Sequence, residues 1–115
     1  MTGRFILAKS VGDKKIADEF YNRAKYYINL FDGSTGFFRG KNSAGMWIPG
    51  FDPYEVSNDY TEGNAWQYSL FVPHDINGLM NLYGGKEKFI ERIDGLFSAK
   101  SVFNGKNIPD RTGVI

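Results

Sequence analysis

Residues 59–85, DYTEGNAWQYSLFVPHDINGLMNLYGG, decide the fold that the sequence predicts. The spacing of the apolar residues predicts a short helix over Asn64–Phe71, which Pro73 ends because proline lacks the N–H that a helix interior requires. Asp75 suits the N-cap of a second helix reaching Tyr83, since its carboxylate can accept hydrogen bonds from the first backbone N–H groups. The pair Gly84-Gly85 then ends that helix.

A further helix is expected directly after this glycine pair, over Lys86–Phe97. Apolar residues recur at helical spacing in both helices. The residues expected to face inward are Ile76, Leu79, Met80 and Tyr83 on the first helix, and Phe89, Ile90, Ile93 and Phe97 on the second. Because two glycines alone separate the helices, the sequence predicts an antiparallel αα-hairpin.

A longer helix is predicted nearer the N-terminus, from an N-cap at Asp13 to about Phe31. Its apolar face consists of Ile16, Phe20, Ala24, Tyr27, Ile28 and Phe31. Gly33 suits the left-handed position that often follows a helix. Residues 1–11 give no clear pattern.

Helical periodicity is absent between Gly33 and Glu62, where glycines, prolines and aromatic rings alternate. A connection of this length is usually functional, because ordering it costs conformational entropy. Residues 98–115 predict turns and coil. The expected fold class is therefore all-α, with αα-hairpins joined by long irregular loops.

Composition excludes several function classes. The chain has 115 residues, a formal net charge of +1 and mixed acidic and basic residues, so nucleic-acid binding has little support. It has no Cys and one His, which disfavours thiolate and zinc sites. No apolar run is long enough to span a membrane and no signal peptide is evident. Aromatic residues are abundant, at 17%; they favour either a core or a surface that stacks on sugars.

The stretch 59–85 closely resembles the signature of the glycoside hydrolase family 92 α-mannosidases. Two flanking stretches resemble the same family: RAKYYINLFDGSTGFFRGKNSAGMW at 23–47 and FDPYEVSNDYTEGNAW at 51–66. The resemblance covers about residues 12–97, and NIPDRTGVI at 107–115 resembles the start of the family's next segment. A pattern of this length is far more specific than an isolated short motif.

The resemblance implies a calcium-dependent, inverting exo-α-mannosidase that acts on mannose-containing oligosaccharides and N-glycans, exported by a bacterium to the periplasm, the cell surface or the medium. It implies an (α/α)6 toroid preceded by a β-sandwich, with Glu62 as the general acid. Residues 1–115 are then expected to be one internal fragment of the toroid, without a complete domain boundary. The catalytic base and most calcium contacts would lie elsewhere, so we expect the isolated chain to bind no calcium and to be inactive.

Other candidate site residues are less specific. Trp66, Gln67 and His74 are candidate substrate contacts, although Trp66 on an apolar helix is more often a core residue and His74 beside a capping Asp75 is more often a partly buried structural residue. Asp52, Glu55, Asp59 and Glu62 suggest calcium because hard cations prefer oxygen ligands, but their spacing matches no calcium loop. We therefore expect no metal site here.

Two other function classes remain open. A helical-repeat interaction module would show self-similarity at a fixed period, and the helices share little beyond amphipathic spacing. A non-catalytic carbohydrate-binding domain would use the aromatic loop and bind sugars on its own. In an enzyme fragment, by contrast, apolar helix faces evolved to pack on absent segments should drive self-association.

Overall fold

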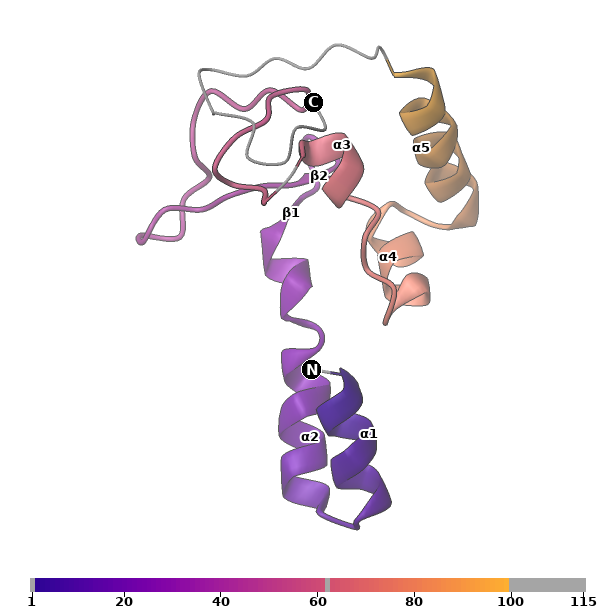
Figure 1. Ribbon diagram of the computed structural model, residues 1–115. Helices are drawn as coiled ribbons and strands as arrows, with labels where there is room; N and C mark the ends of the chain where they lie inside the picture. The colour runs from indigo at the N-terminus through magenta and orange to yellow at the C-terminus, as the bar shows by residue number, and fades with distance from the viewer. Residues whose placement is uncertain (1, 62, 100–115) are drawn as a thin grey trace.

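The computed structural model describes residues 2–61 and 63–99. In order, its elements are α1 (Thr2–Ser10), α2 (Lys14–Arg23), the 3₁₀ helix η1 (Tyr26–Leu30), β1 (Phe31–Asp32), β2 (Phe37–Phe38), α3 (Ala65–Tyr68), α4 (Ile76–Leu82) and α5 (Lys86–Ser98). The α1–α2 pair extends away from the remaining elements, and η1 connects it to them (Figure 1). The helix-rich part is thus divided between two hairpins, α1–α2 and α4–α5.

The α1–α2 hairpin packs through small residues. Ala8 and Ala17 are both buried, which lets the two backbones approach closely. The rings of Phe5 and Tyr21 add a contact with centroids 5.6 Å apart. The short sequence of α1 gave no clear pattern, so its existence is a finding of the structure alone.

The predicted helix from Asp13 to Phe31 is correct at its start and wrong at its end. Asp13 caps α2, with its Oδ1 accepting from the backbone N of Ile16 at 3.1 Å. The α-helix ends at Arg23, and η1 follows. The carbonyl oxygen of Ala24 lies 2.8 Å from Nε2 of His74, whereas the N–H of Ile28, which would bond to it in an α-helix, donates to Lys25 at 3.2 Å. A tertiary contact therefore coincides with the helix break.

The structure is helix-rich, as predicted, but the all-α class is not confirmed, because β1 and β2 form a small two-stranded antiparallel sheet. Phe31 pairs with Phe38 and Asp32 with Phe37. In the turn, Gly36 rather than Gly33 takes the left-handed conformation, at φ +70°. The loop beyond β2 contains an antiparallel bridge between Lys41 and Trp47. The loop is therefore structured, as expected.

The second hairpin largely follows the prediction. Asp75 caps α4, accepting from the backbone N of Gly78 at 3.0 Å, and Gly84 and Gly85 both have positive φ between α4 and α5. The helix predicted over Asn64–Phe71 is shorter, at Ala65–Tyr68. Residues 100–115, predicted as turns and coil, lie outside the described residues.

The core is small and lies around α3. Its buried apolar side chains there are Phe37, Ala65, Val72 and Leu79. Several side chains predicted to face inward are instead exposed by 41–83%: Ile16, Ile28, Ile76, Ile90 and Phe97. Helical spacing identifies an apolar face, but it does not show which side chains of that face other elements cover. Leu79, on the same face of α4 as Ile76, is fully buried. No described helix has both the length and the apolar character that a membrane crossing would need.

Candidate active site

Glu62, the candidate general acid, lies outside the described residues. The structure does describe the residues on either side of it. On the C-terminal side, Asn64 is the N-cap of α3. The backbone N of Asn64 donates to Oε1 of Gln67 at 3.0 Å, and the backbone N of Gln67 donates to Oδ1 of Asn64 at 3.3 Å. This reciprocal capping box fixes the start of the helix.

Gly63 has no room for a side chain. A Cβ at this position would collide with Oε1 of Gln67 and lie 3.2 Å from the Tyr68 ring. Gly63 and Asn64 are both buried. The residue directly after Glu62 is therefore packed against the capping box.

On the N-terminal side, Tyr60 is anchored to the sheet. Its hydroxyl donates a 2.6 Å hydrogen bond to the carbonyl oxygen of Phe38, and its ring lies 5.6 Å from that of Tyr68. Burial raises the pKa of Tyr60 to about 12, so the phenol stays neutral and continues to donate. Residues two positions before and two positions after Glu62 are thus both held.

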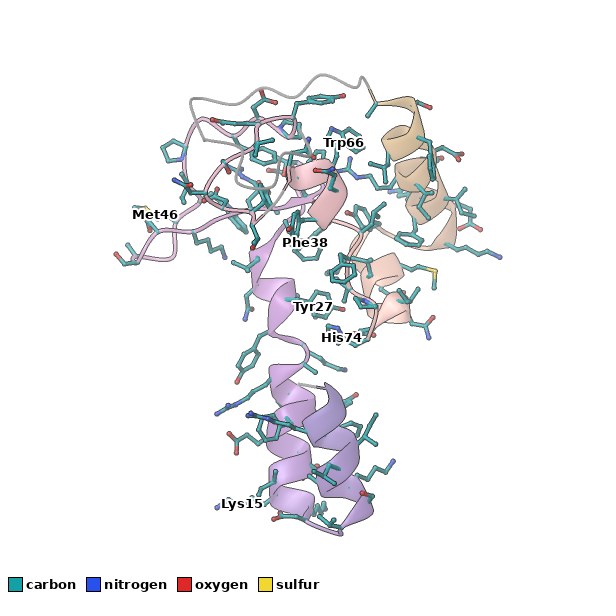
Figure 2. All side chains as sticks on the ribbon, in the orientation of Figure 1. Lys15, Tyr27, Phe38, Met46, Trp66 and His74 are labelled. Atoms are coloured by element: carbon teal, nitrogen blue, oxygen red, sulfur yellow. The ribbon has the colours of Figure 1, made fainter. Side chains whose placement is uncertain are left out.

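Trp66 lies in an aromatic cluster between α3 and α5 (Figure 2). Its ring meets Phe37 edge-on at 5.0 Å between centroids and Tyr54 at 6.0 Å. The guanidinium carbon of Arg92 lies 4.3 Å from the Trp66 ring centre. Nε1 of Trp66 is buried and has no hydrogen-bond partner within residues 2–61 and 63–99. Sequence reasoning named Trp66 but not Arg92, because a helical arginine between Glu91 and Ile93 has no distinguishing pattern.

Gln67 and His74 lie apart from one another. Gln67 is exposed on α3, with its side-chain oxygen used in the capping box. His74 is exposed rather than partly buried, and it precedes α4, where its ring meets Tyr27 edge-on at 5.6 Å. Figure 2 shows Trp66 on α3 and His74 in the loop that leads into α4. Trp66 and Gln67 are neighbours on α3 but take part in different contacts, and His74 lies in a different segment.

An ion pair that the sequence analysis missed stabilises the loop before the site. Nη1 of Arg39 lies 2.6 Å from Oδ2 of Asp32, and Nη2 donates to the carbonyl of Ile48 at 2.8 Å. Hydrogen bonds from Ser34, partly offset by burial and reinforced by Arg39, hold the pKa of Asp32 well below its usual range. The turn sequence Asp-Gly-Ser-Thr-Gly is the signal that could have revealed Asp32 as a turn-forming carboxylate.

The acidic residues that the structure describes do not form a group that could hold a metal ion. No group of three His, Asp or Glu side chains suitable for a metal occurs among residues 2–61 and 63–99. Oδ1 of Asp52 accepts from the backbone N of Tyr54 at 2.9 Å, as in a turn. The side chains of this stretch therefore do not fit a calcium site by themselves.

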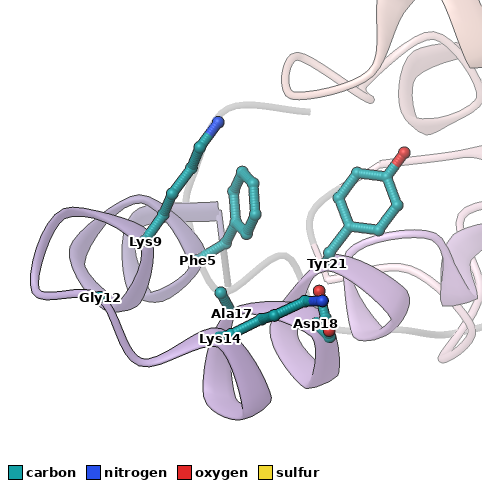
Figure 3. Close-up of a pocket in the computed structure, with 7 residues that line it drawn as sticks. All are labelled: Phe5, Lys9, Gly12, Lys14, Ala17, Asp18 and Tyr21. Atoms are coloured by element: carbon teal, nitrogen blue, oxygen red, sulfur yellow. The ribbon is translucent and has the colours of Figure 1, made fainter.

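A separate cleft of about 410 Å³ lies between α1 and α2. Its lining residues are Phe5, Lys9, Gly12, Lys14, Ala17, Asp18 and Tyr21, with the Phe5 ring over Ala17 and the Tyr21 ring further along α2 (Figure 3). None of the candidate site residues lines it.

Comparison with known proteins agrees with the resemblance in the sequence. The family model described as the glycosyl hydrolase family 92 catalytic domain matches residues 5–114. Among solved structures, the family GH92 α-mannosidase BT3965 from Bacteroides thetaiotaomicron is 39% identical with a TM-score of 0.73, covering 81% of this chain and 12% of that one. The inverting mannosidase BT2199 from the same species is 40% identical with a TM-score of 0.74, covering 76% and 12%.

Two further matches extend the comparison. BT3965 in complex with mannoimidazole is 35% identical with a TM-score of 0.75, covering 84% of this chain and 14% of that one. An uncharacterized secreted glycosidase from Arthroderma benhamiae is 30% identical, covering 87% of this chain and 16% of the relative. The chain thus spans 12–16% of the length of these relatives. With the family model matching nearly its whole length, the chain belongs to glycosyl hydrolase family 92.

Proposed function

We propose that this chain is part of an exo-α-mannosidase and supplies its general acid, Glu62. The observation that carries the proposal is the 39–40% identity with two solved mannosidases over 76–81% of the chain. The anchoring of Tyr60 and Asn64 on either side supports it, because a general acid must be held within hydrogen-bond reach of the leaving oxygen. The chain supplies a rigid support for one carboxyl group.

The proposed reaction inverts the anomeric centre, as the name of BT2199 states for that relative. Glu62 protonates the glycosidic oxygen as the bond to the anomeric carbon breaks. A second carboxylate, from polypeptide outside this chain, removes a proton from the attacking water on the opposite face of the sugar. Inversion requires about 6.5–9.5 Å between the two carboxyl groups, which leaves space for the water.

The proposed substrates are mannose-containing glycans, in keeping with the complex between BT3965 and mannoimidazole. Trp66, Gln67 and His74 are the proposed sugar contacts. Nε1 of Trp66 is a donor without a partner among the described residues, and the amide nitrogen of Gln67 is the remaining polar group of a side chain whose oxygen is already used. Both can donate to sugar hydroxyls.

Calcium is proposed for the full-length enzyme only. The described residues do not fit a calcium site, so its ligands would come from other segments and no step is assigned to the ion here. The proposed architecture is part of an (α/α)6 toroid, supported by the α1–α2 and α4–α5 hairpins. Export from the cell is proposed from the secreted relative.

Kinetics of the full-length protein test the proposal. We expect hydrolysis of α-mannosides with β-mannose as the first product, observed by NMR before mutarotation. Glu62→Gln should lower kcat on a mannose disaccharide by about 10²–10⁴-fold, the usual contribution of general acid–base catalysis, with little change in KM. The 115-residue chain alone should show neither turnover nor measurable mannose binding. Unchanged activity in Glu62→Gln would refute the role of Glu62, and sugar affinity in the isolated chain would favour a carbohydrate-binding domain.

A further inference from the structure

Arg92 is a charged residue whose position the proposed function leaves unexplained. Its guanidinium carbon lies 3.6 Å from the ring centre of Phe37, 4.3 Å from that of Trp66 and 5.7 Å from that of Tyr83. Nη2 is buried and has no hydrogen-bond partner in the part of the chain that the structure describes. No carboxylate lies within 4.0 Å of Arg92 among the residues that the structure describes.

Packing alone does not require a cation at this position. Desolvation of a charge without a carboxylate is unfavourable, and an apolar side chain of similar volume often replaces a buried charge at no cost. What a guanidinium adds is attraction to the faces of aromatic rings and a planar surface that stacks on them. Its ring partners come from β2, α3 and the end of α4, so Arg92 connects α5 to all three.

The element that depends most on such a connection is α3. It has four residues, and a helix this short is stabilised by its surroundings rather than by its own hydrogen bonds. Two hydrogen bonds hold Ser69, after the helix: the backbone N of Phe38 donates to its Oγ at 3.0 Å, and the Tyr83 hydroxyl donates to its carbonyl at 3.0 Å. Arg92 contacts Trp66 instead, near the end of α3 that follows Glu62.

A few residues link the contact between Arg92 and Trp66 to the residues that follow Glu62. Trp66 precedes Gln67, whose side chain closes the capping box on Asn64 and packs over Gly63. A shift of Trp66 would therefore move the capping box and the residue that follows Glu62. Misplacement of a catalytic group by about 1 Å can cost about 10²-fold in rate.

We propose that Arg92 is a positioning residue for Glu62, acting through its stacking on Trp66. The proposal rests on the proposed function, in which Glu62 is the general acid. It assigns to Arg92 no contact with the substrate. Lysine should replace it poorly, because an ammonium group lacks the planar surface of the guanidinium.

The test compares two substrates in the full-length enzyme. A mannose disaccharide has a sugar leaving group that must be protonated, whereas 2,4-dinitrophenyl α-mannoside releases an anion that is stable without protonation. Glu62→Gln should lose activity on the disaccharide and retain most of it on the aryl mannoside. Arg92→Met should show the same selectivity, with kcat on the disaccharide lower by about 10²-fold and KM nearly unchanged. Arg92→Lys should show the same pattern to a smaller extent.

Arg23→Met is the matched control, because Arg23 also lies over an aromatic ring, 5.4 Å from Phe20, but on the exposed surface of α2. It should leave both rates unchanged. Equal loss on both substrates in Arg92→Met, or no loss on either, would overturn the proposal. If Arg92→Met does not fold, Arg92→Lys decides by the same comparison. A Glu62→Gln variant without leaving-group selectivity would instead refute the general-acid role.

Discussion

The hydroxyl of Tyr27 donates a 2.7 Å hydrogen bond to Oδ2 of Asp75, a residue 48 positions later in the chain. Asp75 uses its other oxygen to cap α4. One carboxylate thus joins η1 to the first turn of α4, and the neighbouring His74 contacts Ala24 at the end of α2. Desolvation and the Asp75 carboxylate raise the pKa of Tyr27 to about 12, so the phenol remains a donor at any pH at which the protein is used.

Tyr27→Phe should destabilise the 115-residue chain by about 1.5–3 kcal/mol, the usual contribution of a hydrogen bond to a charged group. The substitution removes one oxygen and keeps the ring contacts with Phe38 and His74. Tyr26→Phe is the control, since Tyr26 is 58% exposed and should change little. Urea unfolding followed by circular dichroism measures the difference, and equal midpoints for the two variants would contradict the assignment.

Acid should destabilise the fold through Asp32 and Asp75. Hydrogen bonds lower the pKa of both carboxyl groups in the folded state. A lowered pKa means that the folded state binds protons less readily than the unfolded state, so the stabilisation is complete above about pH 4 and is lost as the pH falls below it. Unfolding midpoints measured from pH 6 to pH 2 should fall, and less steeply in Asp32→Asn. Asp94→Asn, at an exposed position, should retain the wild-type slope.

Gly63→Ala should inactivate the full-length enzyme. The added methyl group would collide with the side-chain oxygen of Gln67 and so displace the capping box after Glu62. We expect kcat to fall by about 10²-fold, as for a catalytic group displaced by about 1 Å. Gly33→Ala is the matched control, because a Cβ there meets nothing within 4 Å. Retained activity in Gly63→Ala would show that the capping box does not position the acid.

Gly95→Ala should stabilise the chain. Gly95 lies within α5, and a Cβ there would lie 3.5 Å from the Trp66 ring, an ordinary van der Waals contact. Replacing glycine in a helix interior gains about 0.5–1 kcal/mol. A thermal unfolding midpoint above that of the wild type confirms the prediction, and a lower midpoint would mean that the α5–Trp66 contact is already fully packed.

The isolated 115-residue chain should self-associate through α1. Ile6 is 59% exposed, Leu7 64% and Val11 70%, so this hairpin presents apolar side chains to solvent. Light scattering should show oligomers whose size falls in Leu7→Glu. The control Lys15→Glu also introduces an acid into the same hairpin, at an exposed polar position, and should leave the oligomers intact.

The sequence predicted the elements whose signals are local. The Asp13 cap, the Asp75 cap and the Gly84-Gly85 joint each depend on residues within one helical turn, and each is confirmed. The end of α2 could not be predicted in the same way. The predicted helix continues to Phe31, but η1 replaces its last part, and just before η1 a ring nitrogen of His74 lies 2.8 Å from the carbonyl oxygen of Ala24, fifty positions earlier.

The same distinction between local signals and tertiary contacts applies to the site residues. Trp66 and Gln67 were identified because they lie in a recognisable motif next to Glu62. Arg92 and the Asp32–Arg39 pair were missed, because their significance comes from rings and carbonyls that other elements supply. The sugar contacts of Trp66, Gln67 and His74 remain a prediction.

The contact between Ala24 and His74 also has a consequence for biosynthesis. The carbonyl of Ala24 meets a side chain that leaves the ribosome fifty residues after it. At about 5–20 residues per second, synthesis takes roughly 3–10 s to supply that partner. During this interval the nascent segment lacks its tertiary contact and can continue α2 as an ordinary helix. Reaching the native break then requires the residues that follow Arg23 to rearrange after α4 has been translated.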